Sequence, residues 1–314
     1  MRHRNKSATD QPHGTAGLSS PRLITALATS LAMLAFAANS ILCRLALAHH
    51  SIDAAGFTII RLASGALMLA LLLAYRHRGK EKPQWHAGAS LALFIYAIGF
   101  SFAYLQLPAG TGALLLFGAV QLSMLCISRY RGERLSPQAS AGIVLAFSGL
   151  VYLLLPGVTS PPLGGSVLMI AAGVAWGIYT LLGKGAKQPL RSSAWNFIGT
   201  LPLLAVTAGI FYPQFHFTFT GVTLALCSGA LASALGYVVW YQALPRLTAT
   251  QAASVQLCVP VIAALLGIAL LGELMSWRLF WAALAVLGGI YLNIRAVRPT
   301  PKQAAARVDT SPRP

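Results

Sequence analysis

Residues 36–44 read FAANSILCR, and residues 176–184, which lie 140 positions further along the chain, read WGIYTLLGK. Each stretch begins with an aromatic residue, carries polar residues in its middle and ends in a cation. The same offset places GERLS (132–136) on GELMS (272–276). Because these matches follow the same order along the chain, they predict that the protein consists of two related halves.

The composition around these stretches is that of a membrane protein. Of the 314 residues, 56% are hydrophobic and 9% are charged, whereas soluble proteins carry about a quarter charged residues. The charges are crowded between apolar runs of roughly 18–24 residues, which are long enough to cross a hydrocarbon core as helices. We predict ten spans, over residues 23–47, 55–75, 87–107, 110–128, 138–155, 163–183, 194–212, 220–243, 248–271 and 277–296.

Five spans per half is an odd number, so the second half must enter the membrane from the opposite side. We therefore expect an all-α integral membrane protein whose ten transmembrane helices form two inverted five-helix repeats, residues 23–155 and 163–296. Inverted repeats with a site at their interface are a common architecture of secondary transporters, because two similar halves can open the site alternately to each face.

The two ends of the chain are polar. Residues 1–22 and 297–314 are rich in Pro, Ser and Thr and are expected to be disordered cytoplasmic tails. Arg22, the apolar stretch after it and AFA (35–37) also resemble a signal peptide with its cleavage site. The repeat continues through position 37, which favours a retained first helix.

The net charge of +17 indicates orientation. With the N-terminus in the cytoplasm, the inner segments hold 20 of the 23 Lys and Arg residues, the outer loops hold Arg278, and the spans hold Arg44 and Arg61. This is the positive-inside asymmetry, so we expect a multi-pass protein of the bacterial inner membrane with both termini cytoplasmic. The basic segments predict contact with membrane lipids and no nucleic-acid partner.

At these residues the chain resembles the drug/metabolite transporter superfamily, specifically its EamA-type members with two tandem five-helix domains. The resemblance covers about residues 23–296 and is carried by the two quoted stretches, by Arg61, by Pro260, and by the helix ends GF…Y…LP (99–108) and GY…Y…LP (236–245). The chain departs from the pattern at Val120, opposite Pro260, and at Leu201, opposite Arg61. The resemblance implies export or exchange of small metabolites, among which amino acids are prominent.

The spans carry aromatic and amide side chains at helical spacing, which are suitable groups for a solute cavity. Asn39, Gln121 and Gln256 lie at mid-span depth, where an unpaired amide costs roughly a few kcal/mol against hydrocarbon. We predict that the substrate-binding residues border one central cavity and are Asn39, Arg44, Tyr96, Phe100, Gln121, Trp176, Tyr179, Tyr237, Trp240 and Gln256.

Several of these groups also have a purely structural interpretation. The amides could form hydrogen bonds between helices. Tyr104, Tyr241 and Tyr291 stand at span ends, where tyrosines gather at the membrane interface, and we expect them in that belt.

The cations in the spans have structural interpretations too. Arg44 and Lys184 lie near the ends of their spans, so they could extend toward the lipid headgroups. Arg61 lies deeper, and its structural alternative is an ion pair with Glu273, which is expected on the same side of the membrane.

No Asp, Glu or His lies in the middle of a predicted span. A proton-coupled transporter usually places such a group in its pathway, so we expect facilitated diffusion or exchange. Intramembrane proteases need a Ser–His pair, two aspartates or a zinc site, so we expect no enzyme, and no cofactor or metal. The hypothesis is a secondary transporter, exporter or exchanger, of a small metabolite such as an amino acid. The alternatives are a non-transporting membrane subunit and a membrane-embedded enzyme.

Overall fold

The computed structural model describes residues 21–76, 85–130, 136–183, 188–243, 246–247 and 255–296. These residues fold almost entirely as helices, and the extended pairing among them is a single bridge between Ile52 and Phe217. Apart from residues 21 and 22, the predicted tails lie outside the described residues.

The five helices of the first half match the predicted spans closely. They are α1 (Pro21–Ala48), α2 (Ala54–Arg76), α3 (Ala87–Ala103), α4 (Ala109–Tyr130) and α5 (Pro137–Leu154). The second half contains α6 (Leu163–Gly183), α7 (Pro189–Ile198), α8 (Leu201–Phe211), the short η1 (Tyr212–Gln214), α9 (Phe219–Leu226), η2 (Cys227–Leu235), α10 (Gly236–Ala243), α12 (Cys258–Leu271) and α13 (Trp277–Ala296).

Eight continuous helical stretches in the described residues are long and apolar enough to cross a membrane, and α3 and α12 are shorter apolar helices. Together they confirm the ten predicted spans. The first part of the ninth span, residues 248–254, lies outside the described residues. The protein is therefore an all-α membrane protein of ten helices.

The seventh span begins earlier than predicted and is bent. It starts at Pro189 rather than at residue 194, and α7 and α8 meet at Gly199 and Thr200. Pro202 stands in the first turn of α8, where its missing N–H group interrupts the helical hydrogen bonds least. The bend is thus located where the chain has lost a backbone donor.

The eighth span is one continuous run in which α9 and α10 are joined by η2, a π-helix of nine residues. π-helical turns are rare and are frequent at functional sites. Residues five apart in an α-helix differ by about 140° in direction, whereas the i→i+5 pattern of the π-helix brings them nearer to one face. Ser228 and Ser233 are five apart and are both buried.

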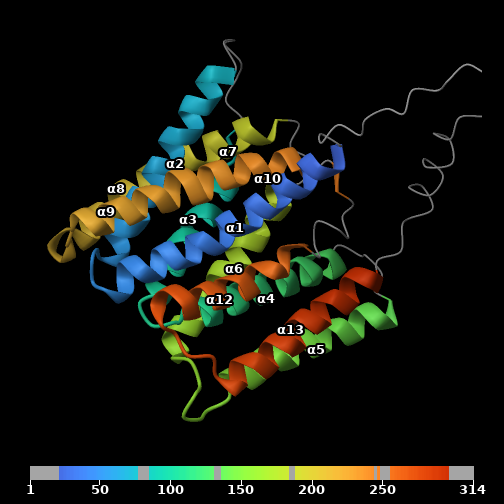
Figure 1. Cartoon of the computed structure of the whole chain (residues 1–314). Coiled ribbons are helices and arrows are strands. Elements are labelled where there is room, and N and C mark those ends of the chain that lie inside the picture. The colour runs from blue at the N-terminus through green and yellow to red at the C-terminus, as the bar shows by residue number, and fades with distance from the viewer. Residues whose placement is uncertain are drawn as a thin grey trace, which may run out of the picture.

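The two halves pack against each other reciprocally. Helix α1 contacts α10 and α12, while α3 and α4 both contact α6, and α5 pairs with α13 along its length. Figure 1 shows α5 and α13 side by side at one edge of the bundle, with α4, α6 and α12 between them and the remaining helices. If a two-fold axis relates the halves, the contacts of α1 with α10 and α12 should have counterparts in the contacts of α6 with α3 and α4, as they do. The division at residues 155 and 163 stays a prediction.

The α5–α13 pair is closely packed through glycines. A Cβ atom on Gly142 would collide with the carbonyl oxygen of Gly289, and one on Gly289 would collide with that of Gly142. The Asn293 side chain donates to the Ala139 carbonyl at 3.0 Å. Small residues let helix backbones approach in a membrane, so these two glycines join the last helices of the two halves.

The expectation for Tyr104 was wrong, because its side chain is fully buried rather than in an interfacial belt. The turn between α3 and α4 is short, so the ring folds beneath the first turn of α4, where Gly112 leaves space for it. Its hydroxyl donates to the Ala109 carbonyl at 3.3 Å. Tyr291 is 44% exposed, as an interfacial position requires, and the side chain of Tyr241 lies outside the described residues.

Candidate functional site

A small cavity lies at the centre of the bundle, between the two halves. Its wall is formed by α1, α3 and α4 of the first half and by α6, η2, α10 and the segment before α12 of the second half. The lining residues are Phe36, Asn39, Ser40, Tyr96, Phe100, Leu116, Phe117, Trp176, Ala232, Ser233, Tyr237 and Gln256. The space left in it for small molecules is about 30 Å³, which is room for about one or two water molecules.

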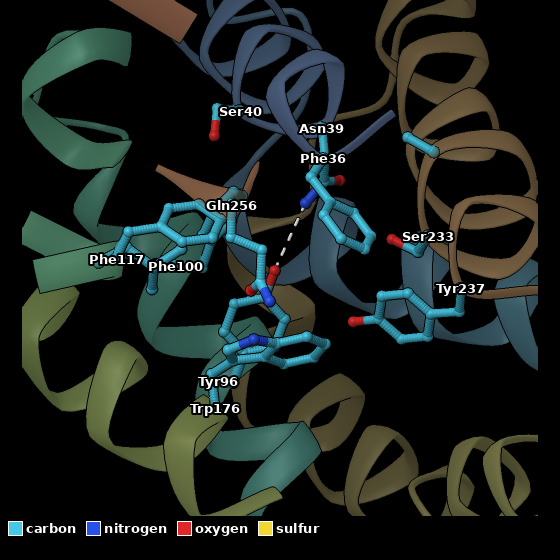
Figure 2. Close-up of a pocket in the computed structure, with 12 residues that line it drawn as sticks. Phe36, Asn39, Ser40, Tyr96, Phe100, Phe117, Trp176, Ser233, Tyr237 and Gln256 are labelled. Atoms are coloured by element: carbon cyan, nitrogen blue, oxygen red, sulfur yellow. Dashed lines mark hydrogen bonds between the residues drawn. The ribbon is translucent and has the colours of Figure 1, made fainter. Parts of the chain in front are cut away.

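Six of the ten residues predicted to bind substrate line this central cavity, namely Asn39, Tyr96, Phe100, Trp176, Tyr237 and Gln256. Figure 2 shows Asn39, Tyr96, Trp176, Tyr237 and Gln256 pointing toward one another from different helices. Tyr179 and Trp240 are one layer behind, packed on lining residues. Gln121 and Arg44 do not line the cavity.

A cluster of aromatic rings forms one part of the wall of the central cavity. The ring centroid of Trp176 lies 4.8 Å from that of Tyr96, 5.2 Å from that of Tyr237 and 5.3 Å from that of Tyr179. Phe36 meets Tyr237 edge-on at 5.9 Å. Trp176 therefore connects α3 of the first half to α10 of the second, and it lines the cavity.

Hydrogen bonds join the polar groups of the cavity wall to one another. The Ser228 hydroxyl donates to Asn39 Oδ1, and Asn39 Nδ2 donates to the Tyr96 hydroxyl at 3.5 Å. The second of these bonds is the dashed line in Figure 2. The structural alternative for Asn39, an interhelical hydrogen bond, is thus correct, and the same side chain also borders the cavity.

A guanidinium lies beside this network. Arg61 is 2% exposed, and its Nη2 donates to the Tyr96 hydroxyl at 2.9 Å while its Nε donates to Ser233 Oγ at 3.4 Å. Its planar end lies over the ring of Phe100, with 4.8 Å between Cζ and the ring centroid. Sequence reasoning left the role of Arg61 open and gave an ion pair with Glu273 as its alternative.

That ion pair belongs to a different arginine. Arg44 Nε lies 3.4 Å from Glu273 Oε1, and Arg44 Nη1 donates to the Tyr104 carbonyl at 2.9 Å. The Glu273 carboxylate also accepts from the backbone N–H of Ala109. Gly272 turns the chain at the end of α12 with φ 64°, which directs Glu273 to the positive N-terminus of α4. Arg44 therefore links helix ends of the two halves.

We expect this link to appear as a coupling free energy. In a double-mutant cycle, Arg44→Gln and Glu273→Gln should be less destabilising together than the sum of the single changes, by about 0.5–3 kcal/mol. Unfolding of the purified protein in detergent measures each variant. The control cycle pairs Glu273→Gln with Arg295→Gln, because Arg295 lies at the far end of α13. Equal coupling in both cycles would contradict the assignment.

A second hollow, which we call the vestibule, opens beside the central cavity. It has a volume of about 170 Å³ and is lined by Leu69, Arg76, Pro189, Leu190, Ser193, Tyr237, Val238 and Gln242. Tyr237 is shared with the wall of the central cavity. Arg76 is the last residue of α2, so the vestibule lies at the end of the bundle that the charge bias predicts to be cytoplasmic.

Within the described residues, no group of three His, Cys, Asp or Glu side chains is placed to hold a metal ion. The acidic side chains that the structure describes are Asp53 and Glu273. Asp53 accepts from the backbone N–H groups of Gly56 and His216, and neither acid lines the central cavity.

Comparison with known proteins supports the resemblance. The model of the EamA-like transporter family matches residues 163–295. An uncharacterized transporter of Archaeoglobus fulgidus is 30% identical over 289 residues, which are 86% of this chain and 96% of the relative. This chain belongs to the EamA-like transporter family. An uncharacterized protein of Pseudomonas aeruginosa is 57% identical over 268 residues, covering 85% of this chain and 93% of the relative.

One further relative of this EamA-like chain and one solved structure extend the comparison. A threonine/homoserine exporter of Salmonella typhimurium is 28% identical over 263 residues, which cover 80% of this chain and 85% of the exporter. A solved crystal structure with 19% sequence identity superposes with a TM-score of 0.62 and covers 86% of this chain and 97% of its own. That likeness shows the fold.

Sequence reasoning missed several residues that line or support the site of this EamA-like transporter. Ser228 was not identified, because a serine in an apolar run carries no signal of its own and its direction depends on the π-helix. Ser233 and Phe117 line the cavity but are not among the ten predicted residues. Arg61 was recognisable as a charge deep in a span, which is a functional signal by default.

Proposed function

We propose that this EamA-like transporter exports or exchanges a small metabolite such as an amino acid, by alternating access through the central cavity. The observation that supports this most directly is that both halves contribute to one cavity whose wall combines amides, hydroxyls and aromatic rings. When two halves share a site, a rocking movement of one against the other exposes it to each side in turn.

The chemistry of the wall suits a zwitterion of amino-acid size. Trp176, Tyr96 and Tyr237 line the cavity, and aromatic faces attract an ammonium group. Asn39, Ser40 and Gln256 provide hydrogen-bonding groups for a polar side chain. The Salmonella relative is a threonine/homoserine exporter, and threonine and homoserine carry both an ammonium group and a hydroxyl.

The cavity is closed in this conformation. Its volume of about 30 Å³ is far below the roughly 300 Å³ or more of typical small-molecule pockets, so loading a solute requires the halves to separate. The shared wall residue Tyr237 makes the vestibule the natural entrance. With both termini in the cytoplasm, as the charge bias predicts, a solute would enter from the cytoplasm and leave on the outer side.

Counterflow tests this proposal. Proteoliposomes made with the purified protein and preloaded with unlabelled threonine and homoserine should take up labelled threonine several-fold faster than liposomes without protein. A panel of other labelled amino acids, each against its own unlabelled form, extends the test to the class. If no amino acid in the panel is exchanged above the protein-free background, the proposed substrate class is wrong.

The same vesicles test ion coupling. Because neither described acid lines the cavity, and because arginine does not lose its proton in proteins, we expect no uphill accumulation when a pH gradient is imposed without a solute gradient. Counterflow with equal pH on both sides is the reference. Accumulation above the equilibrium ratio that Glu273→Gln abolishes would show that a carboxylate takes part in transport.

A further inference from the structure

Arg61 is a fully buried cation in a membrane helix, and no carboxylate among the described residues neutralises it. It lies two turns into α2 and is 2% exposed. The two described carboxylates are engaged elsewhere, Asp53 with backbone N–H groups and Glu273 with Arg44 and Ala109. A charge at such depth is costly in free energy and is usually retained because it serves a function. The surroundings of Arg61 therefore indicate what that function is.

The hydrogen bonds of Arg61 leave one nitrogen free. A guanidinium has five N–H donors. Nε donates to Ser233 and Nη2 donates to Tyr96, whereas Nη1 is buried and has no hydrogen-bond partner in the described structure. The guanidinium is also within 4.8–5.2 Å of the ring centroids of Phe100 and Tyr96. Every side chain in this group of contacts lines the central cavity.

The hydroxyl of Tyr96 also has an unused hydrogen-bond donor. It accepts from Arg61 Nη2 at 2.9 Å and from Asn39 Nδ2 at 3.5 Å. A phenolic oxygen has two lone pairs and one proton, so both lone pairs are in use. Among the described residues its proton has no acceptor. Tyr96 lines the central cavity, and Arg61 lies directly behind it. An unused hydroxyl donor at the wall and an unused guanidinium donor behind it thus lie next to each other.

We propose that Arg61 Nη1 and the Tyr96 hydroxyl bind the carboxylate group of the transported solute. A carboxylate accepts from two donors at once, and its single negative charge directly compensates the positive charge of Arg61 in an apolar site. The positive charge of an ammonium group on the same solute would lie apart from Arg61, against the aromatic rings. A phosphate dianion would leave an uncompensated negative charge. This inference rests on the proposed function and narrows its substrate class to small carboxylates, with the ammonium of an amino acid against the aromatic rings.

Gly229 lets the π-helix approach α2 at Arg61. Gly229 of η2 packs directly on the Arg61 carbonyl, and the adjoining Ser233 hydroxyl accepts from Arg61 Nε. The guanidinium is therefore held by α2, α3 and η2 together. Opening of the cavity moves the second half against the first, so it moves Ser233 relative to Tyr96 and changes the donors that Arg61 offers to the solute.

The test uses acetate as the probe, because it is the smallest stable carboxylate and suits a narrow cavity. Thermal unfolding of the purified full-length protein is followed during titration with acetate, with acetamide and with chloride at matched ionic strength. We expect saturable stabilisation by acetate and none by acetamide. Tyr96→Phe keeps the ring and removes the hydroxyl, and should weaken the apparent acetate affinity about tenfold or more, as loss of a hydrogen bond to a charged group does.

Arg61→Lys keeps the charge but removes the fork of donors, and we expect a similar loss. Arg295→Gln, which removes an exposed cation at the end of α13, should respond to acetate as the wild type does. Equal stabilisation by acetate and acetamide, or an unchanged acetate response in folded Tyr96→Phe, would overturn the proposal. Stronger stabilisation by inorganic phosphate than by acetate would overturn the choice of carboxylate.

Transport separates this inference from the proposed function. Wild-type proteoliposomes should exchange threonine and reject threonine amide, which keeps the ammonium group but lacks the carboxylate. Exchange of both at equal rates would refute the role of Arg61 while leaving amino-acid transport intact. A specific acetate response without exchange of any amino acid would support the anion site and refute the amino-acid proposal.

Discussion

Gly289→Leu is expected to destabilise the fold strongly and to lower the yield of correctly folded protein. Gly142 and Gly289 bring the backbones of α5 and α13 into direct contact, and a Cβ atom at either position already meets a carbonyl oxygen of the other helix. Backbone atoms cannot move aside as a flexible side chain can. Overpacking typically costs about 1–3 kcal/mol and occasionally more, and a four-carbon side chain between two backbones belongs at the upper end of this range. This is a large part of a typical folding free energy of about 5–15 kcal/mol.

The neighbouring glycine provides the control. A Cβ atom on Gly288 would meet no atom within 4 Å, so Gly288→Leu has the same change of volume and helix propensity without the collision. The measurement is the yield of monodisperse protein in size-exclusion chromatography, with the midpoint of thermal unfolding. We expect Gly288→Leu to resemble the wild type. Equal loss in both variants, or normal behaviour of Gly289→Leu, would contradict the α5–α13 contact.

Trp176→Ala is expected to lower amino-acid counterflow at least tenfold. Trp176 makes ring contacts with Tyr96, Tyr179 and Tyr237 at centroid distances of 4.8–5.3 Å. Each such pair is worth about 0.5–1.5 kcal/mol beyond burial, and about 1.4 kcal/mol corresponds to a tenfold change. The alanine variant also loses the π-face that we propose for the ammonium group, so both the shape and the chemistry of the site change.

Trp281 is the matched control, because it is the same residue type on the outer surface of α13, where it is 53% exposed. Trp281→Ala should retain counterflow, and Trp176→Phe should be intermediate, because it keeps an aromatic face of smaller size. Equal losses in Trp176→Ala and Trp281→Ala would show that the effect is one of general stability. Unfolding midpoints of all three variants identify that case directly.

The sequence was sufficient to predict much of the central cavity. Asn39 and Gln256 interrupt long apolar runs, and a polar group at that depth has few uses other than a hydrogen bond or a cavity. Both uses apply to Asn39. Gln121 carried the same signal and yet lies outside the lining, because the direction of a side chain on α4 depends on how that helix is rotated against α6 and α12.

The two arginines show the limit of reasoning from depth alone. Arg44 was predicted to bind substrate; in this structure it pairs with Glu273 and does not line the central cavity, because Gly272 directs that carboxylate to the start of α4. The role of Arg61 was left open, with an ion pair to Glu273 as its structural alternative, and the side chain lies among Tyr96, Phe100 and Ser233. Both outcomes depend on contacts between segments far apart in sequence, and the periodicity of a single helix does not predict which of these contacts form.

By itself, the sequence determined that this protein lies in a membrane and how many spans it has, and it predicted that the two halves are related. Apolar runs of this length must cross a bilayer as helices, because every backbone polar group needs a partner there. Only the tertiary structure decided which face of each helix meets which neighbour. That choice depends on close contacts such as Gly229 on Arg61 and on a π-helical turn that places Ser228 and Ser233, and these depend on packing against other helices rather than on local sequence.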